Sequence, residues 1–151
     1  VVTTPATPEL APEGAGQAII DWSWRGTALF TVTAVLATIS PDLFRWPAVV
    51  VALGLFAIGC VVFLWAFAIA VERSRVDAIG VGGLYFLAGS APRSVQRQLM
   101  GSLAVQVVVA LVTASIRVFT SLAFGVLVPV FGLAMAGLWG ARYGAFERND
   151  T

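Results

Sequence analysis

The residues that could act as acids or bases lie outside the long apolar stretches of this sequence. Eight residues are acidic: Glu9, Glu13, Asp21, Asp42, Glu72, Asp77, Glu147 and Asp150. The chain has no histidine and no lysine, which excludes imidazole acid–base chemistry, the usual Cys/His zinc sites and Schiff-base lysines. We therefore predict that the protein is not an enzyme and that it holds no catalytic residue, no cofactor and no metal.

A few polar residues do fall inside the apolar stretches. Gln106 could bind a quinone or a lipid carbonyl, but a glutamine in a membrane helix more often bridges two helices, and we favour that role. Together with Thr113 and Ser115 it could also contribute to a polar path through the protein. Cys60 lies in the middle of an apolar stretch with no histidine to activate it, so we expect an inert, packed thiol.

The absence of buried acids weighs against coupled transport. A proton- or ion-coupled transporter needs a group that changes charge at membrane depth, and no acidic residue lies inside an apolar stretch. The chain has the size of a small four-helix drug antiporter but lacks the buried glutamate that such a protein carries in its first span. Nine cationic residues against eight acidic ones also give no basic field for a nucleic acid.

The composition places most of the chain in hydrocarbon. Of 151 residues, 59% are apolar and 11% are charged, whereas soluble domains carry about 25% charged residues. We predict an all-α, polytopic membrane protein with four transmembrane helices arranged as two hairpins. The expected spans are residues 24–40, 48–71, 99–116 and 118–140. The second, which has no charge over its whole length, is the clearest signal.

Shorter segments are expected to connect these spans. Residues 41–47 have the composition of a tight interfacial turn, and a turn near Arg117 must separate the last two spans. Pro129 should kink the fourth span. Residues 76–91 are apolar but rich in glycine and too short to span, so we expect an interfacial or re-entrant loop. Ser90 and Pro92 then offer a cap and a first position for the next helix.

The two ends of the sequence differ from the bundle expected at 21–148. Residues 1–20 are rich in proline and poor in large apolar side chains, so this segment should form an extended tail that becomes ordered only against a partner. Residues 149–151 form the C-terminal end. Four spans place both ends on the same side of the membrane.

The arginines predict which side this is. Seven fall on that side: Arg25, Arg73, Arg75, Arg93, Arg97, Arg142 and Arg148. The two others, Arg45 and Arg117, fall on the short turns of the opposite side, so we expect a bacterial cell membrane protein with both termini in the cytoplasm. Aromatic residues should mark the two interfaces. Those expected at the cytoplasmic side are Trp22, Trp24, Trp65, Trp139 and Tyr143, and those at the other are Phe44 and Trp46.

Two sets of residues are candidate contact sites. Arginines framing the loop between the second and third spans could bind anionic phospholipids or a partner's acidic residues, or simply set the topology. They are Arg73, Arg75, Arg93 and Arg97. Small residues recur every four positions as a helix-packing ridge. These are Gly132, Ala136, Gly140 and Gly144. The ridge serves either packing inside the bundle, which we favour, or contact with another subunit.

The segment Glu72–Arg97 and the run Gly137–Gly144 resemble those of small multi-pass membrane proteins of mycobacteria and related actinobacteria. Some proteins of this type are accessory subunits of the cytochrome bcc-aa3 respiratory supercomplex. The resemblance implies a non-catalytic accessory subunit that takes part in electron transport by binding larger integral membrane proteins. The alternative is a small independent transporter or channel.

Overall fold

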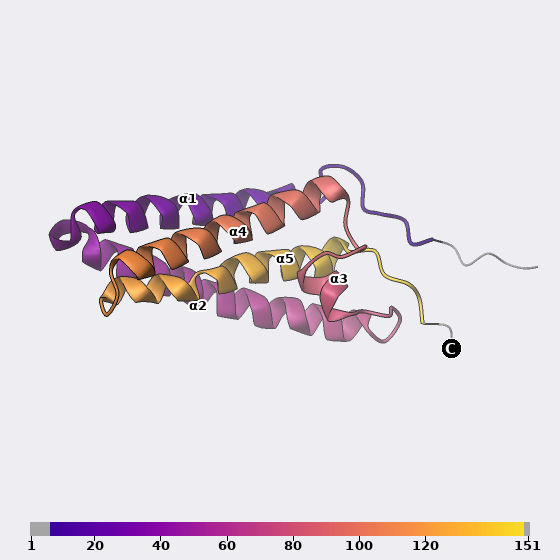
Figure 1. The fold of residues 1–151 in the computed structure, drawn as a ribbon. Coiled ribbons are helices and arrows are strands. Elements are labelled where there is room, and N and C mark those ends of the chain that lie inside the picture. Colours follow the sequence, from indigo (N-terminus) through magenta and orange to yellow (C-terminus); the bar gives the residue numbers. More distant parts are fainter. Residues whose placement is uncertain (1–6, 150–151) are drawn as a thin grey trace, which may run out of the picture.

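The computed structural model describes residues 7–149, and these form an elongated bundle of helices (Figure 1). In chain order the elements are α1 (Gln17–Ile39), α2 (Pro41–Arg73), α3 (Val81–Tyr85), α4 (Arg93–Ile116), the 3-10 helix η1 (Ser121–Leu127) and α5 (Pro129–Tyr143). Among the described residues the extended pairing is limited to an isolated bridge between Asp77 and Arg148. The predicted all-helical fold is therefore confirmed for this part of the chain.

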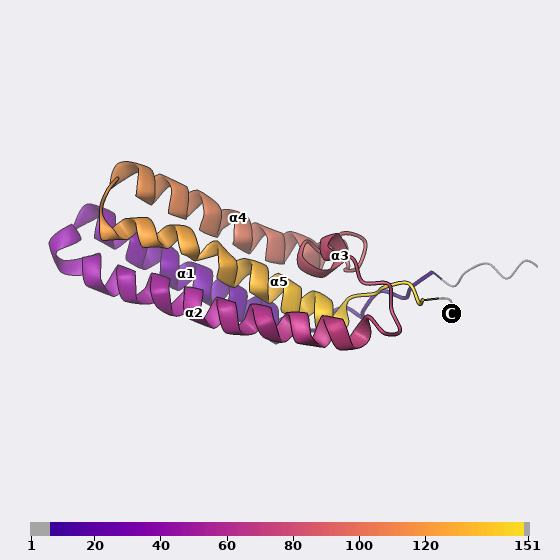
Figure 2. The same ribbon diagram turned by 90° about the horizontal axis from the view of Figure 1, so that it is seen from below.

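Three segments are long and apolar enough to cross a membrane: α2, α4, and η1 together with α5. At 1.5 Å per residue, the 33 residues of α2 extend about 50 Å, well beyond the roughly 30 Å hydrocarbon layer. Helix α1 packs along α2 and α4 (Figure 2), but its first turns carry Asp21 and Arg25, both exposed. The two described ends and α3 lie together at one end of the bundle (Figure 1).

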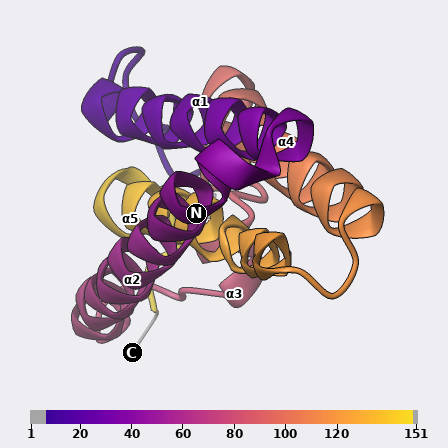
Figure 3. The same ribbon diagram turned by 90° about the vertical axis from the view of Figure 1, so that its left-hand side faces the viewer.

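Helix α5 forms the centre of the bundle, with α1, α2 and α4 around it (Figure 3). Ten of its fifteen residues are buried. Three apolar clusters fill the interior along its length. One surrounds Phe30, Leu55 and Phe131, and a second surrounds Leu99 and Trp139 at the α3 end. The third surrounds Tyr85 and Leu138 between α2, α3 and α5. Van der Waals packing of these side chains stabilises the bundle.

The prediction of a turn over residues 41–47 is wrong. This segment is the start of α2, which begins directly at Pro41 and contains Pro47 within its first two turns. A single residue, Ser40, separates α1 from α2. Proline cannot continue a preceding helix, but its fixed φ suits the first position of the next one. Pro41 therefore ends one helix and begins the other.

The fourth span also differs from the prediction. The turn near Arg117 is confirmed, because α4 ends at Ile116. The chain then continues as η1, and α5 begins at Pro129, so the proline lies at a helix start and does not kink a continuous helix. Phe119 in the turn has a left-handed backbone (φ 63°) and a fully exposed side chain, which marks the tip of this hairpin.

The predicted glycine-rich loop contains the short helix α3, which packs against α5. Ser90 does not cap α4, because its hydroxyl donates to the carbonyl of Gly83. Pro92 precedes the first residue of α4 and does not occupy it. The loop is thus folded onto the end of the bundle, with Leu84 and Tyr85 buried.

The tail is shorter than predicted and is held by the bundle itself. Residues 17–20 belong to α1, which begins at Gln17. Ile20 is buried in the apolar cluster around Trp139, and this burial stabilises the first turn of the helix. The indole of Trp139 donates to the carbonyl of Ala15 at 2.9 Å. Ala11 packs against the same cluster, and residues 1–6 lie outside the described part. Trp139 is 0% exposed, so its predicted place in the interfacial aromatic belt is wrong.

Candidate functional site

A buried cluster of polar side chains lies where α1, α4 and α5 meet. Its members are Ser23 and Thr27 from α1, Ser102 and Gln106 from α4, and the backbone amide of Gly132 in α5. The four side chains are at most 2% exposed. We call this set the polar cluster. Gln106, which the sequence predicted to bridge helices, lies in this cluster and bridges α4 to α1 and α5.

Hydrogen bonds connect the polar cluster into one closed set. Gln106 Nε2 donates to Thr27 Oγ1 at 2.7 Å, and Gly132 N donates to Gln106 Oε1 at 3.1 Å. Ser102 Oγ lies 2.8 Å from Ser23 Oγ and 2.7 Å from Thr27 Oγ1. Thr27 Oγ1 donates back to the carbonyl of Ser23. Each hydroxyl therefore has at least one partner within the cluster, and these bonds stabilise one register of the three helices.

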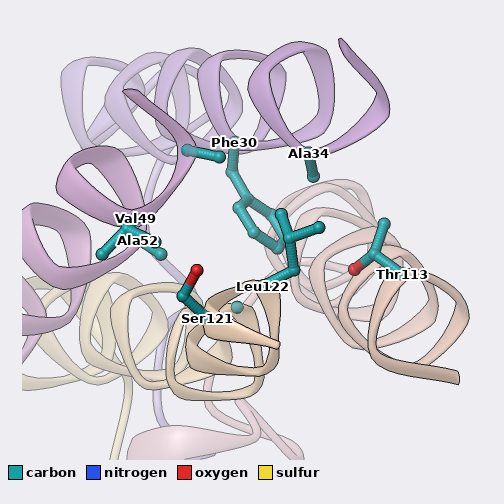
Figure 4. A pocket seen from close by; sticks show the side chains of 9 residues that line it. Phe30, Ala34, Val49, Ala52, Thr113, Ser121 and Leu122 are labelled. Atoms are coloured by element: carbon teal, nitrogen blue, oxygen red, sulfur yellow. The ribbon is translucent and has the colours of Figure 1, made fainter. Parts of the chain in front are cut away.

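The polar cluster does not continue into a path along the bundle. Thr113 and Ser115 donate to carbonyls of their own helix, so neither joins Gln106. A cavity of only about 10 Å³, room for about one water, lies farther toward the η1 end. Figure 4 shows Phe30 and Leu122 projecting between the two polar residues that line it, Thr113 and Ser121.

The predicted small-residue ridge packs inside the chain. A Cβ at Gly132 would lie 2.6 Å from Gln106 Oε1, and one at Gly140 would meet the carbonyl oxygen of Leu84 in α3. Ala136 is fully buried, and Gly144 is the first residue after α5. Gly132 and Gly140 thus contact α4 and α3. Because Gly132, Ala136 and Gly140 are all buried, they are not available to another subunit.

Of the four candidate arginines, Arg73 is used internally. Its guanidinium forms an ion pair with Asp77 at 2.9 Å. It also donates to the carbonyls of Ala141 and Gly144, at 2.8 and 3.1 Å, and lies over the ring of Phe146. Arg73 therefore ties the end of α2 to the end of α5, so it has little capacity left for a lipid or a partner.

The segment after α5 is held against the loop after α2. The amide of Ala78 donates to the carbonyl of Glu147, and that of Asn149 donates to the carbonyl of Val76. Ala145 N donates to the carbonyl of Ser90. We call this arrangement, residues 144–149 together with Arg73 and Asp77, the C-terminal clasp. Its bonds lie on both sides of α3 in the chain, at Val76 and Ala78 before the helix and at Ser90 after it.

The other three candidate arginines, Arg75, Arg93 and Arg97, have exposed side chains at the α3 end. The structure does not bring them together with Arg73 into one site. Sequence reasoning missed Ser23, Thr27 and Ser102 as members of the polar cluster. A signal was present, because Ser23/Thr27 and Ser102/Gln106 are each four residues apart and so lie on one helix face.

The outer face of α2 has no partner in the described part of the chain. Its members follow one another at alternating spacings of four and three residues, and all are exposed: Val50, Gly54, Ala57, Val61, Leu64 and Ala68. We call this set the α2 seam. On the opposite face, the backbone of Phe131 in α5 lies 2.8 Å from where a Cβ of Gly59 would be. A Cβ at Gly54 would meet nothing within 4 Å.

Comparison with known proteins adds no assignment. No protein-family model, curated protein sequence or solved structure matches this chain. Function therefore has to be argued from the residues and their geometry.

Proposed function

We propose that the protein is a non-catalytic accessory subunit that packs beside a larger integral membrane protein. The observation that carries this proposal is the α2 seam. A glycine inside a helix costs about 1 kcal/mol relative to alanine, and Gly59 uses its small size for contact with α5. Gly54 has no such use within the chain. Small residues on a membrane helix let a second helix approach closely, so the α2 seam suits a helix of another protein.

The interior supports a structural role over transport. The polar cluster has its hydrogen bonds satisfied internally, and the apolar clusters around Phe131 and Trp139 lie on either side of it. Within residues 7–149, the acidic side chains lie at the ends of the helices and in the connecting segments. A transporter or channel, the second candidate, would need a polar path that the bundle in this conformation does not provide.

We further propose four spans with both termini in the cytoplasm. Helix α1 packs along α2 and α4, so a membrane that surrounds those helices would also surround most of α1. Its exposed Asp21, Trp22 and Arg25 would then lie at the headgroup level. The exposed arginines concentrated at the α3 end favour the cytoplasmic side for that end.

Co-purification tests the proposal most directly. The chain carries a C-terminal tag, is expressed in its native membrane and is extracted in mild detergent. We expect larger integral membrane subunits to elute with it in stoichiometric amounts. Haem absorbance in the eluate tests whether the partner is a cytochrome bcc-aa3 respiratory supercomplex. Elution of the chain alone, together with ion or solute flux when it is reconstituted in liposomes, would favour the transporter.

Two variants test whether the α2 seam is the contact. Gly54→Leu should reduce co-purification strongly, because the added side chain separates the two helix backbones. Ala104→Leu places the same side chain on the exposed face of α4 and should leave co-purification unchanged. If the two variants behave alike, the contact is not made by α2.

A further inference from the structure

A shallow apolar groove lies on the surface where the last turns of α2 meet α3. Its volume is about 140 Å³. Two of its lining residues, Ser74 and Tyr85, carry hydroxyls. The hydroxyl of Ser74 already donates to the carbonyl of Val71. The lining residues are Phe67, Ala70, Val71, Ser74, Ile79, Gly80, Val81, Leu84 and Tyr85. Pockets for small molecules usually measure about 300 Å³ or more, so this groove suits a stretch of hydrocarbon chain better than a compact ligand.

The groove crosses the level expected for the boundary between hydrocarbon and lipid headgroups. The apolar stretch of α2 continues without a charge as far as Val71, and charged residues follow directly after it, so headgroups are expected at the end of α2. The groove begins at Phe67, within the apolar stretch, and extends to Ser74. A lipid whose chain entered here would have its headgroup near the end of α2.

The charge beside the groove is positive. Arg75 follows Ser74 directly and is exposed. Arg73 on the same turn is committed to the C-terminal clasp, and so is its partner Asp77. Glu72 is also exposed. Around the helix axis, however, its side chain points about 120° away from the mean direction of the Val71 and Ser74 side chains, and so away from the groove. Arg75, in the turn after α2, is thus the exposed and uncommitted charged residue next to the groove lining in sequence.

We infer that the groove binds one acyl chain of an anionic phospholipid, whose phosphate lies beside Arg75. Apolar walls favour the chain, and a guanidinium near the surface favours an anionic headgroup. Helix α3 packs on α5 with Leu84 and Tyr85 buried, so the groove is formed without a ligand. The site belongs to the single chain, and therefore exists whether or not the chain joins a larger complex.

Two glycines provide a matched test. Gly80 lines the groove in an extended backbone (φ −95°), and a Cβ there would meet nothing within 4 Å. Gly82 is equally open but does not line the groove. The full chain is reconstituted in vesicles containing phosphatidylglycerol with a photoreactive diazirine on one acyl chain. After illumination and digestion, mass spectrometry locates the labelled residues.

We expect labelling within residues 67–85 of the wild type. Gly80→Trp should remove most of this labelling, because the indole fills the groove, whereas Gly82→Trp should retain it. Both variants should keep the wild-type unfolding temperature, since neither added side chain meets an existing atom at its Cβ. Equal labelling of wild type and Gly80→Trp would overturn the proposal, as would protection of the groove by a polypeptide instead of lipid.

The charge preference is tested with Arg75→Gln. Wild type should be labelled more by diazirine phosphatidylglycerol than by diazirine phosphatidylcholine at this site, and the variant should lose about fivefold of that preference, the factor for one arginine near an anionic headgroup. Arg93→Gln removes a charge at the start of α4, a helix that contributes no residue to the groove lining, and is the control. Equal labelling of wild type by the two lipids would contradict an anionic site.

Discussion

Helices α5 and α2 are both apolar, but they serve opposite purposes. In their most apolar stretches, 56% of the residues are buried in the segment that contains α5, against 28% in α2. The glycines of α5 are closed by neighbours, such as Tyr85 over Gly137 and Leu84 over Gly140. In α2 the inward Gly59 is closed, whereas the outward Gly54 is open.

This contrast shows that hydropathy alone does not identify the surface that a membrane helix presents. Both helices satisfy the same criteria of length and composition. They differ in where their small residues lie, since those of α5 pack inside the bundle, whereas those of the α2 seam are exposed on its surface. We therefore expect substitutions in the two regions to separate folding from association.

The largest effect is expected where α2 meets α5. Gly59→Leu places a side chain against the backbone of Phe131, which cannot move aside as a flexible side chain could. We expect a loss of about 3 kcal/mol or more in the free energy of unfolding. Gly54→Leu, on the outer face of the same helix, should leave that free energy unchanged or slightly raised. Denaturant titration in detergent micelles, followed by circular dichroism, measures both.

A similar loss of stability in the two variants would show that Gly54 is also packed in the folded chain. The contrast between the inner and outer faces of α2, on which the proposed function depends, would then be lost.

The next effect concerns the polar cluster. Gln106→Leu removes the bonds to Thr27 and to the amide of Gly132. The amide is left buried without this partner, whereas Thr27 keeps its bonds to Ser23 and Ser102. We expect a loss of about 2 kcal/mol. Gln98→Leu makes the same change at an exposed position of the same helix, so its effect should be close to zero. If Gln106→Leu is as stable as wild type, the cluster does not contribute to the register of the helices.

The sequence was sufficient for the helical class and for the approximate position of most helices. Long apolar runs predicted the three segments that are long and apolar enough to cross a membrane. A 42-residue apolar stretch cannot cross a 30 Å layer once, so the turn near Arg117 followed from length alone. The bridging role of Gln106 also followed, because a buried amide in a membrane helix needs a partner.

Other features depended on contacts that single residues do not reveal. Pro41 is compatible with both a helix end and a helix start. Trp139 suits an interface by type, and only its neighbours Leu87 and Leu99 make it a core residue. Arg73 looked like the other arginines because its acceptors, the carbonyls of Ala141 and Gly144, are 68 or more residues away in the chain.

A moderate effect is expected at the C-terminal clasp. Arg73→Gln removes the ion pair to Asp77 and the bonds to two carbonyls. Because the side chain is 30% exposed, the loss of stability should be modest, about 1 kcal/mol. Hydrogen exchange at the amides of Ala78, Ala145 and Asn149 should accelerate more than in the bundle. Arg75→Gln is the control, and unchanged exchange in Arg73→Gln would show that backbone bonds alone hold the clasp.

The smallest effect is expected at Tyr85, which stacks on Phe63 between α2 and α5. Its side chain is 6% exposed, and its hydroxyl has no hydrogen-bond partner within the described residues. Tyr85→Phe removes this unpaired polar group and keeps the ring. We therefore expect a gain of about 1 kcal/mol or less in the free energy of unfolding at neutral pH.

Alkaline pH sharpens this last prediction. Burial raises the pKa of Tyr85 above its ordinary value of 10.0, because an apolar environment disfavours the phenolate. The unfolded chain then releases its proton first, so the contribution of Tyr85 to stability is complete below about pH 10 and is lost as the pH rises further. Between pH 9 and 11.5 wild type should lose more stability than Tyr85→Phe. Parallel curves, or a variant less stable than wild type at pH 7, would mean that the hydroxyl has a partner, with the groove lipid the nearest candidate.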